Sequence, residues 1–350
     1  MKTICIKASK SYQVHIGQQL IPQAATYIQK IHPVCKAAII SDSNVYPLFG
    51  KALEDSLSAS GFSVISYVFT AGEASKNGET FLEILNFLAE NEMTRSDFLI
   101  ALGGGVVGDI TGFAAATFLR GVSYIQIPTT LLAMVDSSVG GKTAIDLPAG
   151  KNLAGAFYQP SLVLCDLNAL DTLPREIFCD GCAEVIKYGV LYDADLFYHL
   201  FEKGLQFDRE DVIARCVEWK RNVVIEDEFD IGARQMLNFG HTVGHGIEKQ
   251  SHFSISHGKA VAIGMAIVSK ASVQSGLCDQ AVYTDICKTL DQFHLPQTTS
   301  FSAEALFISA LSDKKRTGDT VNLIVPLKIG QCAIKTTPTN EVKSFIEAGL

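Results

Sequence analysis

The chain contains a short buried-strand pattern that runs directly into a glycine-rich turn and a helix of small residues. The apolar run 98–102 precedes Gly103, Gly105 and Gly108, and the small-residue run 111–116 follows them. At this G-x-G-x-x-G spacing, the absent side chains let backbone N–H groups approach a pyrophosphate at the helix N-terminus. A plain tight turn fits the spacing about as well, because no acidic residue stands out about 20 positions further on. The feature therefore predicts an α/β fold and leaves dinucleotide binding open.

The two halves of the chain differ in their periodicity. The first half alternates apolar strand-like runs, such as 37–40 and 124–127, with helical patterns, as in an open α/β sheet. After about residue 172, long amphipathic stretches such as 211–225 and 261–275 dominate, and strand signals are few. Since 350 residues exceed what one hydrophobic core usually supports, we expect an α/β domain followed by a mainly α-helical domain, with a boundary near 173–174.

Charge and composition exclude several classes of protein. The formal net charge is −8 and no run of Lys or Arg is present, which argues against nucleic acid or an anionic membrane as a main partner. No apolar segment approaches the ~18 residues of a membrane span, and the N-terminus leads into polar residues rather than a signal-peptide core. Nine scattered cysteines fit reduced thiols, and the Cys179/Cys182 pair has no second pair at zinc-finger spacing. We therefore expect a cytoplasmic protein.

Four of the eight histidines lie in one short stretch, at His241, His245, His252 and His257. His241 and His245 are four residues apart, so on a helix their side chains share one face. Neutral imidazoles suit zinc or a similar divalent ion, and a catalytic site usually has three protein ligands, often including a carboxylate, plus an open position. Any single histidine here is more often a helix cap or a backbone partner. A cluster of three histidines, however, favours the interpretation that they form half of a catalytic metal site.

A candidate for the missing carboxylate is Glu184. It lies three residues before Lys187 on a predicted helix that is otherwise apolar. The alternative is a local surface ion pair, which contributes little and requires no function. Further basic and amide groups flank the histidine cluster, each of which alone is more often a solvated surface residue: Lys220, Arg234, Asn238 and the segment 313–315.

The segment 140–143 ends like a nucleotide-binding P-loop. The first glycine of that motif would fall at position 136, which is Asp136, so a nucleoside-triphosphate site is disfavoured. What remains is Lys142 near Asp136, followed by Lys151 and Asn152, in a segment flanked by apolar residues. Cationic and polar groups in such a setting suggest a site that holds an anion.

Taken together, these segments resemble the 3-dehydroquinate synthase family, over most of the chain. The resemblance implies a Rossmann-like NAD-binding domain over 1–172, a mainly α-helical metal- and substrate-binding domain over 173–350, NAD and one divalent metal, zinc or cobalt, as cofactors, and a homodimer. The matching segments are 72–76, 104–109, 128–160, 183–188, 237–245, 257–258 and 313–315.

The resemblance also implies a set of site residues. It assigns the metal to Glu184, His241 and His257, which amends the spacing argument by moving His245 to the substrate. Arg120 is implied to grip the substrate phosphate, in its own or the partner subunit's site. The implied NAD contacts are Asp42, Asn44, Glu73, Lys76, Gly104, Gly105, Val106, Asp109, Thr129, Thr130, Lys142, Lys151 and Thr172. The implied substrate contacts are Arg120, Asp136, Lys142, Asn152, Lys187, Lys220, Arg234, Asn238, His245 and Lys314.

The implied activity is that of a carbon–oxygen lyase acting on a small anionic sugar phosphate. The substrate would be 3-deoxy-D-arabino-heptulosonate 7-phosphate, which is oxidised by NAD at its carbon-5 hydroxyl, loses phosphate, is reduced again and recloses to 3-dehydroquinate. Other sugar-phosphate cyclases, a metal-dependent polyol dehydrogenase and a non-catalytic NAD or metal sensor are the alternatives. The chain departs from the family at Lys259, where Glu is common after the His-Gly pair. We expect Lys259 to point to solvent, because a cation beside a metal ligand would weaken metal binding.

Overall fold

The computed structural model describes residues 1–311, 316–317 and 319–350. The chain divides into two compact units: unit 1 comprises Met1–Pro174 and Arg209–Phe229, and unit 2 comprises Arg175–Asp208 and Asp230–Leu350. The domain boundary at 172–173 stays a prediction. The compact units differ from it mainly in the segment Arg209–Phe229, because helix α7 (Arg209–Glu226) packs on the first two strands of unit 1.

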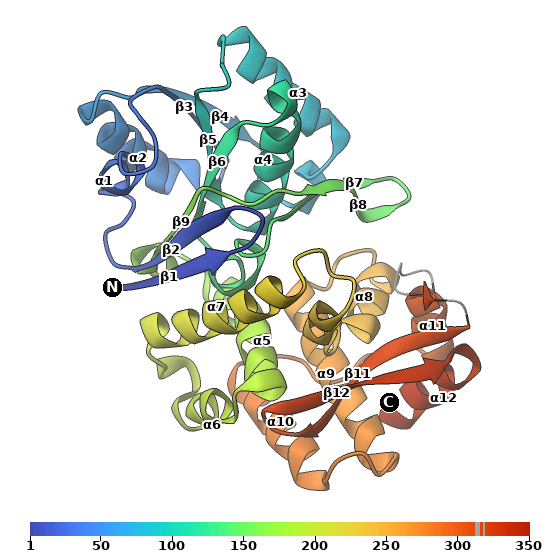
Figure 1. The fold of residues 1–350 in the computed structure, drawn as a ribbon. Helices are drawn as coiled ribbons and strands as arrows, with labels where there is room; N and C mark the ends of the chain where they lie inside the picture. The colour runs from blue at the N-terminus through green and yellow to red at the C-terminus, as the bar shows by residue number, and fades with distance from the viewer. Residues whose placement is uncertain (312–315, 318) are drawn as a thin grey trace. The chain divides into compact units, whose positions relative to one another are not determined.

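A seven-stranded sheet forms the centre of unit 1 (Figure 1). The strand order is β1-β2-β9-β6-β5-β3-β4, and all neighbours are parallel except the β1/β2 hairpin. The three runs predicted as strands lie in β3, β5 and β6, and the predicted α/β fold class is confirmed. The strands are β1 (Lys2–Lys7), β2 (Ser11–Gly17), β3 (Lys36–Asp42), β4 (Ser63–Phe69), β5 (Phe98–Gly103), β6 (Ser123–Pro128) and β9 (Leu162–Asp166).

Helices cover both faces of this sheet (Figure 1). In β5, Phe98, Ile100 and Leu102 pack in a core cluster with α1 and α2, whereas Leu99 and Ala101 pack with α3 and α4. Successive side chains of a strand point to opposite faces, so a strand buried on both sides reads as one continuous apolar run. The helices are α1 (Ala24–Ile28), α2 (Tyr46–Ala59), α3 (Gly78–Glu90) and α4 (Gly105–Thr117).

The strand order reverses between β3 and β5. From β3 the chain moves outward to β4, then returns to pair β5 against the other side of β3. Ligands of open α/β sheets bind beyond the carboxyl ends of strands at such a switch point. Asp42 ends β3, and Gly103 ends β5 immediately before α4. The predicted NAD residues at 42–44 and 104–109 therefore follow the two strands that flank the switch point.

Unit 1 is completed by a hairpin and several short helical turns. The hairpin consists of β7 (Lys142–Leu147) and β8 (Gly150–Phe157), and β7 packs on α4. It contains Lys142, Lys151 and Asn152 of the segment expected to hold an anion. The turns are η1 (Glu73–Ser75), η2 (Phe118–Arg120), η3 (Ala133–Ser137) and η4 (Leu167–Asp171).

Unit 2 is mainly α-helical and is organised around α9. This 18-residue helix packs on α5, α8, α10 and α12, and it is buried along most of its length. A helix that is apolar on all sides belongs in a core. The helices are α5 (Arg175–Tyr192), α6 (Ala194–Lys203), α8 (His241–Gln250), α9 (His257–Gln274), α10 (Gln280–Gln292), α11 (Ala303–Leu311) and α12 (Thr339–Gly349), with turns η5 (Gly204–Gln206) and η6 (Ala233–Asn238).

A small antiparallel sheet in unit 2 was not predicted. It consists of β10 (Arg316–Thr317), β11 (Thr320–Lys328) and β12 (Gln331–Pro338). The β-branched residues of β11 are typical of a strand, but β12 is mostly polar and partly exposed, so its sequence does not indicate a partner strand. Among the described residues, no helix is long and apolar enough to cross a membrane.

Candidate active site

Helix α5 supplies a buried carboxylate and a buried ammonium group. Glu184 and Lys187 are each 1% exposed, and the two side chains form an ion pair one helical turn apart. Because both are buried, the alternative of a solvated surface ion pair is wrong. A charged pair in a helical core is costly to maintain, so its retention calls for a partner or a function.

Helices α8 and α9 each begin with a histidine. His241 is the first residue of α8 and follows Gly240, whose φ of 77° lies in the left-handed region that favours glycine. A Cβ on Gly264 of α9 would lie 2.0 Å from the carbonyl oxygen of Gly240. Glycine at both positions therefore lets the start of α8 press against α9. His257 is the first residue of α9.

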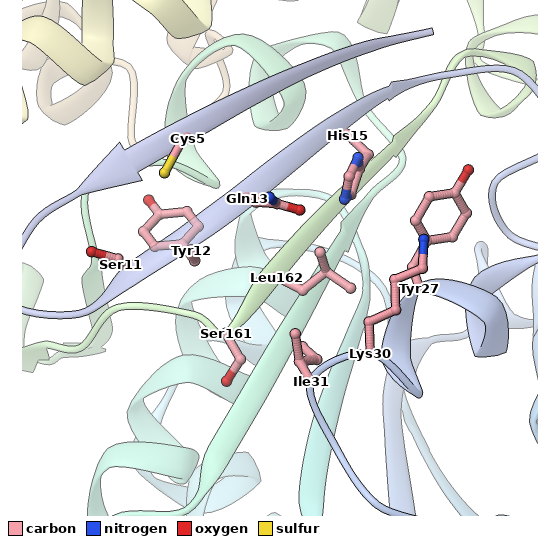
Figure 2. Close-up of a pocket in the computed structure, with 10 residues that line it drawn as sticks. All are labelled: Cys5, Ser11, Tyr12, Gln13, His15, Tyr27, Lys30, Ile31, Ser161 and Leu162. Carbon is pink, nitrogen blue, oxygen red and sulfur yellow. The ribbon is translucent and has the colours of Figure 1, made fainter.

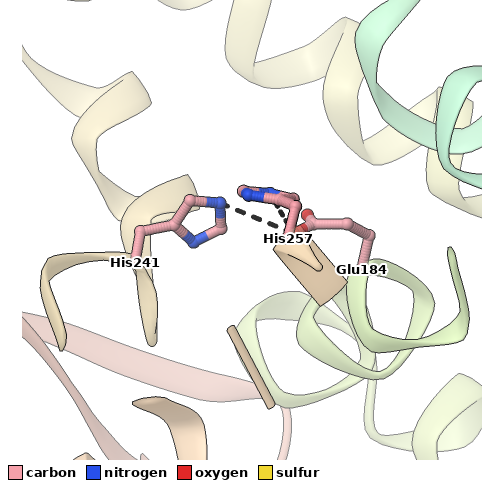
Figure 3. Close-up of side chains that lie close together, drawn as sticks. All are labelled: Glu184, His241 and His257. Atoms are coloured by element: carbon pink, nitrogen blue, oxygen red, sulfur yellow. Dashed lines mark ion pairs between the residues drawn. The ribbon is translucent and has the colours of Figure 1, made fainter. Parts of the chain in front are cut away.

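The two histidines converge on Glu184 (Figure 3). The Nε2 atoms of His241 and His257 each lie 3.5 Å from Glu184 Oε1. One ligand atom from each of the three side chains lies within 4.8 Å of the others. Two imidazoles and one carboxylate are the donor set of a catalytic zinc-type site that keeps a position open for water or substrate. The structure thus brings together the three residues that the resemblance assigned to the metal.

The outer nitrogens of both imidazoles have partners. His241 Nδ1 donates to the carbonyl oxygen of Phe239 at 3.1 Å, and His257 Nδ1 lies 3.4 Å from Glu248 Oε2. These partners on Nδ1 fix the orientation of the rings and direct Nε2 toward Glu184, which leaves Nε2 as the atom that would ligate a metal ion. Burial lowers the pKa of His257, but its contacts with Glu184 and Glu248 outweigh this effect and raise the pKa to about 10. Two oriented imidazoles and one buried carboxylate, with ligand atoms within 4.8 Å of one another, fit a divalent metal ion.

His245 lies beside this cluster rather than in it. Its ring centroid is 5.5 Å from that of His241 and 6.3 Å from that of His257, and with Glu248 and His257 it forms a second group of close ligand atoms. Spacing alone would have paired His241 with His245, whereas the group that includes Glu184 contains His257. Glu248 was not predicted as a site residue, although it follows His245 by three residues on the same helix.

In unit 1, Lys76 gathers three carboxylates. Its Nζ lies 2.8 Å from Asp109 Oδ2, 3.9 Å from Glu73 Oε1 and 4.0 Å from Asp146 Oδ1. Burial lowers the pKa of Lys76, but Asp109 and Glu73 outweigh this and raise it. Burial raises the pKa of Asp109. Lys151 adds a second cation, 3.1 Å from Glu73 Oε1, so four of the predicted NAD residues form one charged network.

Other predicted NAD residues follow the carboxyl ends of strands. Asp42 Oδ1 accepts from the N–H groups of Asn44 and Val45 at 2.9 and 3.0 Å, which holds the turn after β3. Thr129 and Thr130 follow β6, and the N–H of Thr129 donates to Gly103 of β5. The N-terminus of α4 at Gly105 has no side-chain cap. Thr172 follows η4, where its hydroxyl donates to the carbonyl oxygen of Ala169.

A second charged pair in unit 1 joins two predicted substrate residues. Lys220 Nζ of α7 donates to Asp136 Oδ1 at 2.8 Å and to the Asp136 carbonyl oxygen at 2.5 Å. Lys220 is 5% exposed, so it is not a solvated surface residue. Asn152 of β8 has a φ of 55°, and its N–H donates to Asp146 Oδ1 at 2.8 Å. Lys142 begins β7.

The remaining predicted substrate residues lie on other elements of the two units. In unit 2, Arg234 is 2% exposed, and Asn238 Nδ2 donates to the carbonyl oxygen of Gln235 at 2.9 Å, both within η6. Arg120 of unit 1 is exposed at the end of η2 with a φ of 66°. Lys314 lies outside the described residues. Lys259 pairs with Glu176 of α5 near the surface.

A pocket of about 260 Å³ lies elsewhere on unit 1, over β1, β2 and the start of β9 (Figure 2). Its lining includes His15, whose pKa is lowered by burial and whose Nδ1 is bonded to the Thr3 hydroxyl at 2.9 Å. The residues that line it include none of those assigned to the metal, NAD or substrate. This pocket therefore contributes nothing to the candidate active site.

Comparison with known proteins shows which family the chain belongs to. The sequence models of the 3-dehydroquinate synthase N-terminal and C-terminal regions match residues 66–180 and 181–316. A 3-dehydroquinate synthase of Enterococcus faecalis is 42% identical over 352 residues, covering 99% of this chain and 98% of the relative. The chain belongs to the 3-dehydroquinate synthase family.

Solved structures of related cyclases have the same fold. A 2-deoxy-scyllo-inosose synthase, complexed with carbaglucose-6-phosphate, NAD⁺ and Co²⁺, superposes with a TM-score of 0.89 at 25% identity and 100% coverage of both chains. The 2-epi-5-epi-valiolone synthase of Streptomyces hygroscopicus, with NAD⁺ and Zn²⁺ bound, gives a TM-score of 0.89 at 25% identity, covering 100% of this chain and 99% of that one. The 3-dehydroquinate synthase family thus shares its scaffold with other sugar-phosphate cyclases.

Proposed function

We propose that the chain catalyses the reaction of its family, the conversion of 3-deoxy-D-arabino-heptulosonate 7-phosphate to 3-dehydroquinate and phosphate. The observation that carries the proposal is the convergence of His241 and His257 on the buried Glu184, in a chain 42% identical to a named 3-dehydroquinate synthase. Identity to the two cyclases with other products is lower, at 25%, which favours the dehydroquinate reaction over theirs.

Glu184, His241 and His257 are the proposed ligands of one zinc or cobalt ion. When bound, the ion supplies Lewis acidity that lowers the pKa of a ligated substrate hydroxyl. The protein's own part is to hold the ligands: Phe239 and Glu248 orient the two imidazoles, and Lys187 forms an ion pair with Glu184.

The NAD site is proposed at the switch point of the unit 1 sheet. Bound NAD⁺ supplies a hydride acceptor that is regenerated within each cycle, so the reaction has no net redox change. The uncapped N-terminus of α4 would offer backbone N–H groups to the pyrophosphate, and Lys76 keeps the carboxylates of Asp109 and Glu73 in place. The full proposed set is Asp42, Asn44, Glu73, Lys76, Gly104, Gly105, Val106, Asp109, Thr129, Thr130, Lys142, Lys151 and Thr172.

The substrate carries a carboxylate, a phosphate and several hydroxyls, so its binding requires cations and polar groups. Lys220 is buried and held by Asp136, and Arg234 is buried, which pre-organises both cations for an anion. His245 lies next to the metal ligands, where an imidazole can take up or release a proton. The proposed substrate set is Arg120, Asp136, Lys142, Asn152, Lys187, Lys220, Arg234, Asn238, His245 and Lys314.

The decisive experiment supplies the heptulosonate phosphate with NAD⁺ and Co²⁺ or Zn²⁺ and measures phosphate and NADH together. We expect phosphate release without NADH accumulation, and loss of that release in Glu184→Gln. NADH accumulation would instead indicate a metal-dependent polyol dehydrogenase. Absence of phosphate release from this substrate, with release from another sugar phosphate, would indicate a different cyclase.

We also propose that the enzyme is a cytoplasmic homodimer in which Arg120 serves the partner's site. Its exposed side chain, on a strained turn held by the bond from Arg95 Nε to the Leu119 carbonyl oxygen, supports this role, and nine free cysteines support a reducing location. Mixing inactive Arg120→Ala with inactive Lys142→Ala should restore turnover, because each heterodimer would contain one intact site. If heterodimers form and remain inactive, Arg120 acts in its own subunit.

A further inference from the structure

The N-terminus of α9 is capped by a carboxylate from α5. Asp180 Oδ1 accepts from the Ser256 hydroxyl at 2.5 Å and from the Lys259 N–H at 2.9 Å, and Asp180 Oδ2 accepts from the Gly258 N–H at 3.2 Å. The first N–H groups of a helix lack partners within the helix and are usually capped by the residue that precedes it. Here Ser256, the preceding residue, makes no such cap and donates its hydroxyl to Asp180 instead.

The backbones of α5 and α9 touch at the same point. A Cβ on Gly258 would lie 2.0 Å from the Asp180 carbonyl oxygen and 2.8 Å from its side-chain Cγ. Only glycine can occupy position 258 without moving one helix away from the other. The cap therefore acts at close range, where a negative charge also interacts favourably with the helix dipole.

This contact links two of the three proposed metal ligands. Asp180 lies four residues, about one turn, before Glu184 on α5, and His257 is the first residue of α9. A second link forms between Glu176 of α5 and Lys259 of α9, the position at which the resemblance would expect Glu. Because Glu176 is 75% exposed, this outer pair contributes little.

We propose that Asp180 is a positioning residue of the metal centre: by capping α9 it fixes His257 relative to Glu184. The inference rests on the proposed metal site. Asp180 is not a ligand, and its effect is transmitted through the first turn of α9. Removing a partner that hydrogen-bonds a metal ligand directly weakens metal binding by about 10- to 100-fold, and Asp180 acts one step further away, so we expect an effect at the lower end of this range.

The test is a Co²⁺ titration of metal-free protein against a competing chelator, with the visible absorption bands of Co²⁺ recorded at saturation. We expect Asp180→Ala to weaken Co²⁺ binding by about 10-fold or more and to change the band shape. Asp180→Asn, which keeps the size of the side chain and one acceptor oxygen, should fall between wild type and Asp180→Ala. This variant decides the question if Asp180→Ala does not fold.

The matched control is Asp193→Ala. Asp193 caps α6 by accepting from the Leu196 N–H at 2.9 Å, in the same unit but away from the metal ligands. It should lower the melting temperature while leaving Co²⁺ affinity and spectrum unchanged. Wild-type affinity and spectrum in folded Asp180 variants, or an equal loss in Asp193→Ala, would overturn the inference alone. A wild-type protein that binds no Co²⁺ would overturn the proposed metal site and the inference with it.

Discussion

Replacing Lys76 with Met tests how strongly one buried ammonium group stabilises unit 1. Its side chain is 5% exposed, and its Nζ lies 2.8 Å from Asp109 Oδ2. Removing one partner of a fully buried ion pair costs about 3–5 kcal/mol, because the other charge is left without compensation. The Asp109 side chain is 21% exposed and that of Glu73 is 40% exposed, so water screens part of this loss. We therefore expect Lys76→Met to lower the free energy of unfolding by about 2–3 kcal/mol at neutral pH.

The loss should depend on pH in one direction. Burial raises the pKa of Asp109 and Lys76 counteracts this, so the pKa of Asp109 rises further when Lys76 is removed. An acid whose pKa is raised by folding destabilises the folded state as pH rises above the ordinary value of about 3.9 and through the folded value. The difference between variant and wild type should therefore be small near pH 4 and should increase toward neutral pH.

Trp219 provides the assay, because it is the only tryptophan and lies in α7 of unit 1. Its fluorescence would be followed during urea unfolding of wild type and Lys76→Met at about pH 5 and about pH 8. The control is Lys76→Met with Asp109→Asn, which removes the stranded charge and should recover most of the stability. A loss that does not depend on pH, or no recovery in the double variant, would refute the reasoning.

Three further substitutions test the two cofactor sites. His241→Ala should remove a metal ligand and with it most bound Co²⁺ and most turnover; full metal content with full turnover would contradict the ligand assignment. Gly105→Val should weaken NAD⁺ binding in a titration while leaving metal content intact, because even its Cβ would lie 3.3 Å from Ser137 Oγ; unchanged NAD⁺ affinity in a folded variant would count against the site. Gly264→Ala should lower the free energy of unfolding by about 1–3 kcal/mol and weaken Co²⁺ binding, because the added Cβ would collide with the Gly240 carbonyl oxygen. Wild-type stability and wild-type Co²⁺ affinity in this variant would show that the close contact is not required.

The fold was predictable where burial is uniform along an element. β5 lies between two helical layers, so all its residues are apolar and the run 98–102 indicated a strand without tertiary information. The hairpins that were not predicted, β7/β8 and β11/β12 among them, are of another kind. β8 and β12 are only partly buried and mix polar with apolar residues, so their pairing depends on partners that periodicity does not identify.

The residue types of the site could be predicted from the sequence, but the burial of these charged side chains and their ion-pair partners could not. Glu184, Lys76 and Lys220 were selected by residue type or by resemblance, yet nothing in their neighbourhoods distinguished a buried ion pair from a solvated one. The buried ammonium group of Lys220 is paired with Asp136, which is 84 residues away in sequence. Asp146, which contacts both Lys76 and the N–H of Asn152, was not predicted, because its partners also lie on other elements of the chain. Sequence spacing describes neighbours along one element, whereas these networks join several.

The histidines show the same limit at the proposed metal site. The four-residue spacing rule pairs His241 with His245, because it considers one helix only. In the structure, His257 lies beside Glu184. It reaches this position because α9 approaches α5 and α8 closely at glycines, where any side chain would collide with the neighbouring helix. The residues that permit the approach, Gly258 and Gly264, have no metal chemistry of their own. The affinity of this centre should therefore be as sensitive to a methyl group added at either glycine as to changes in residues that touch the ligands.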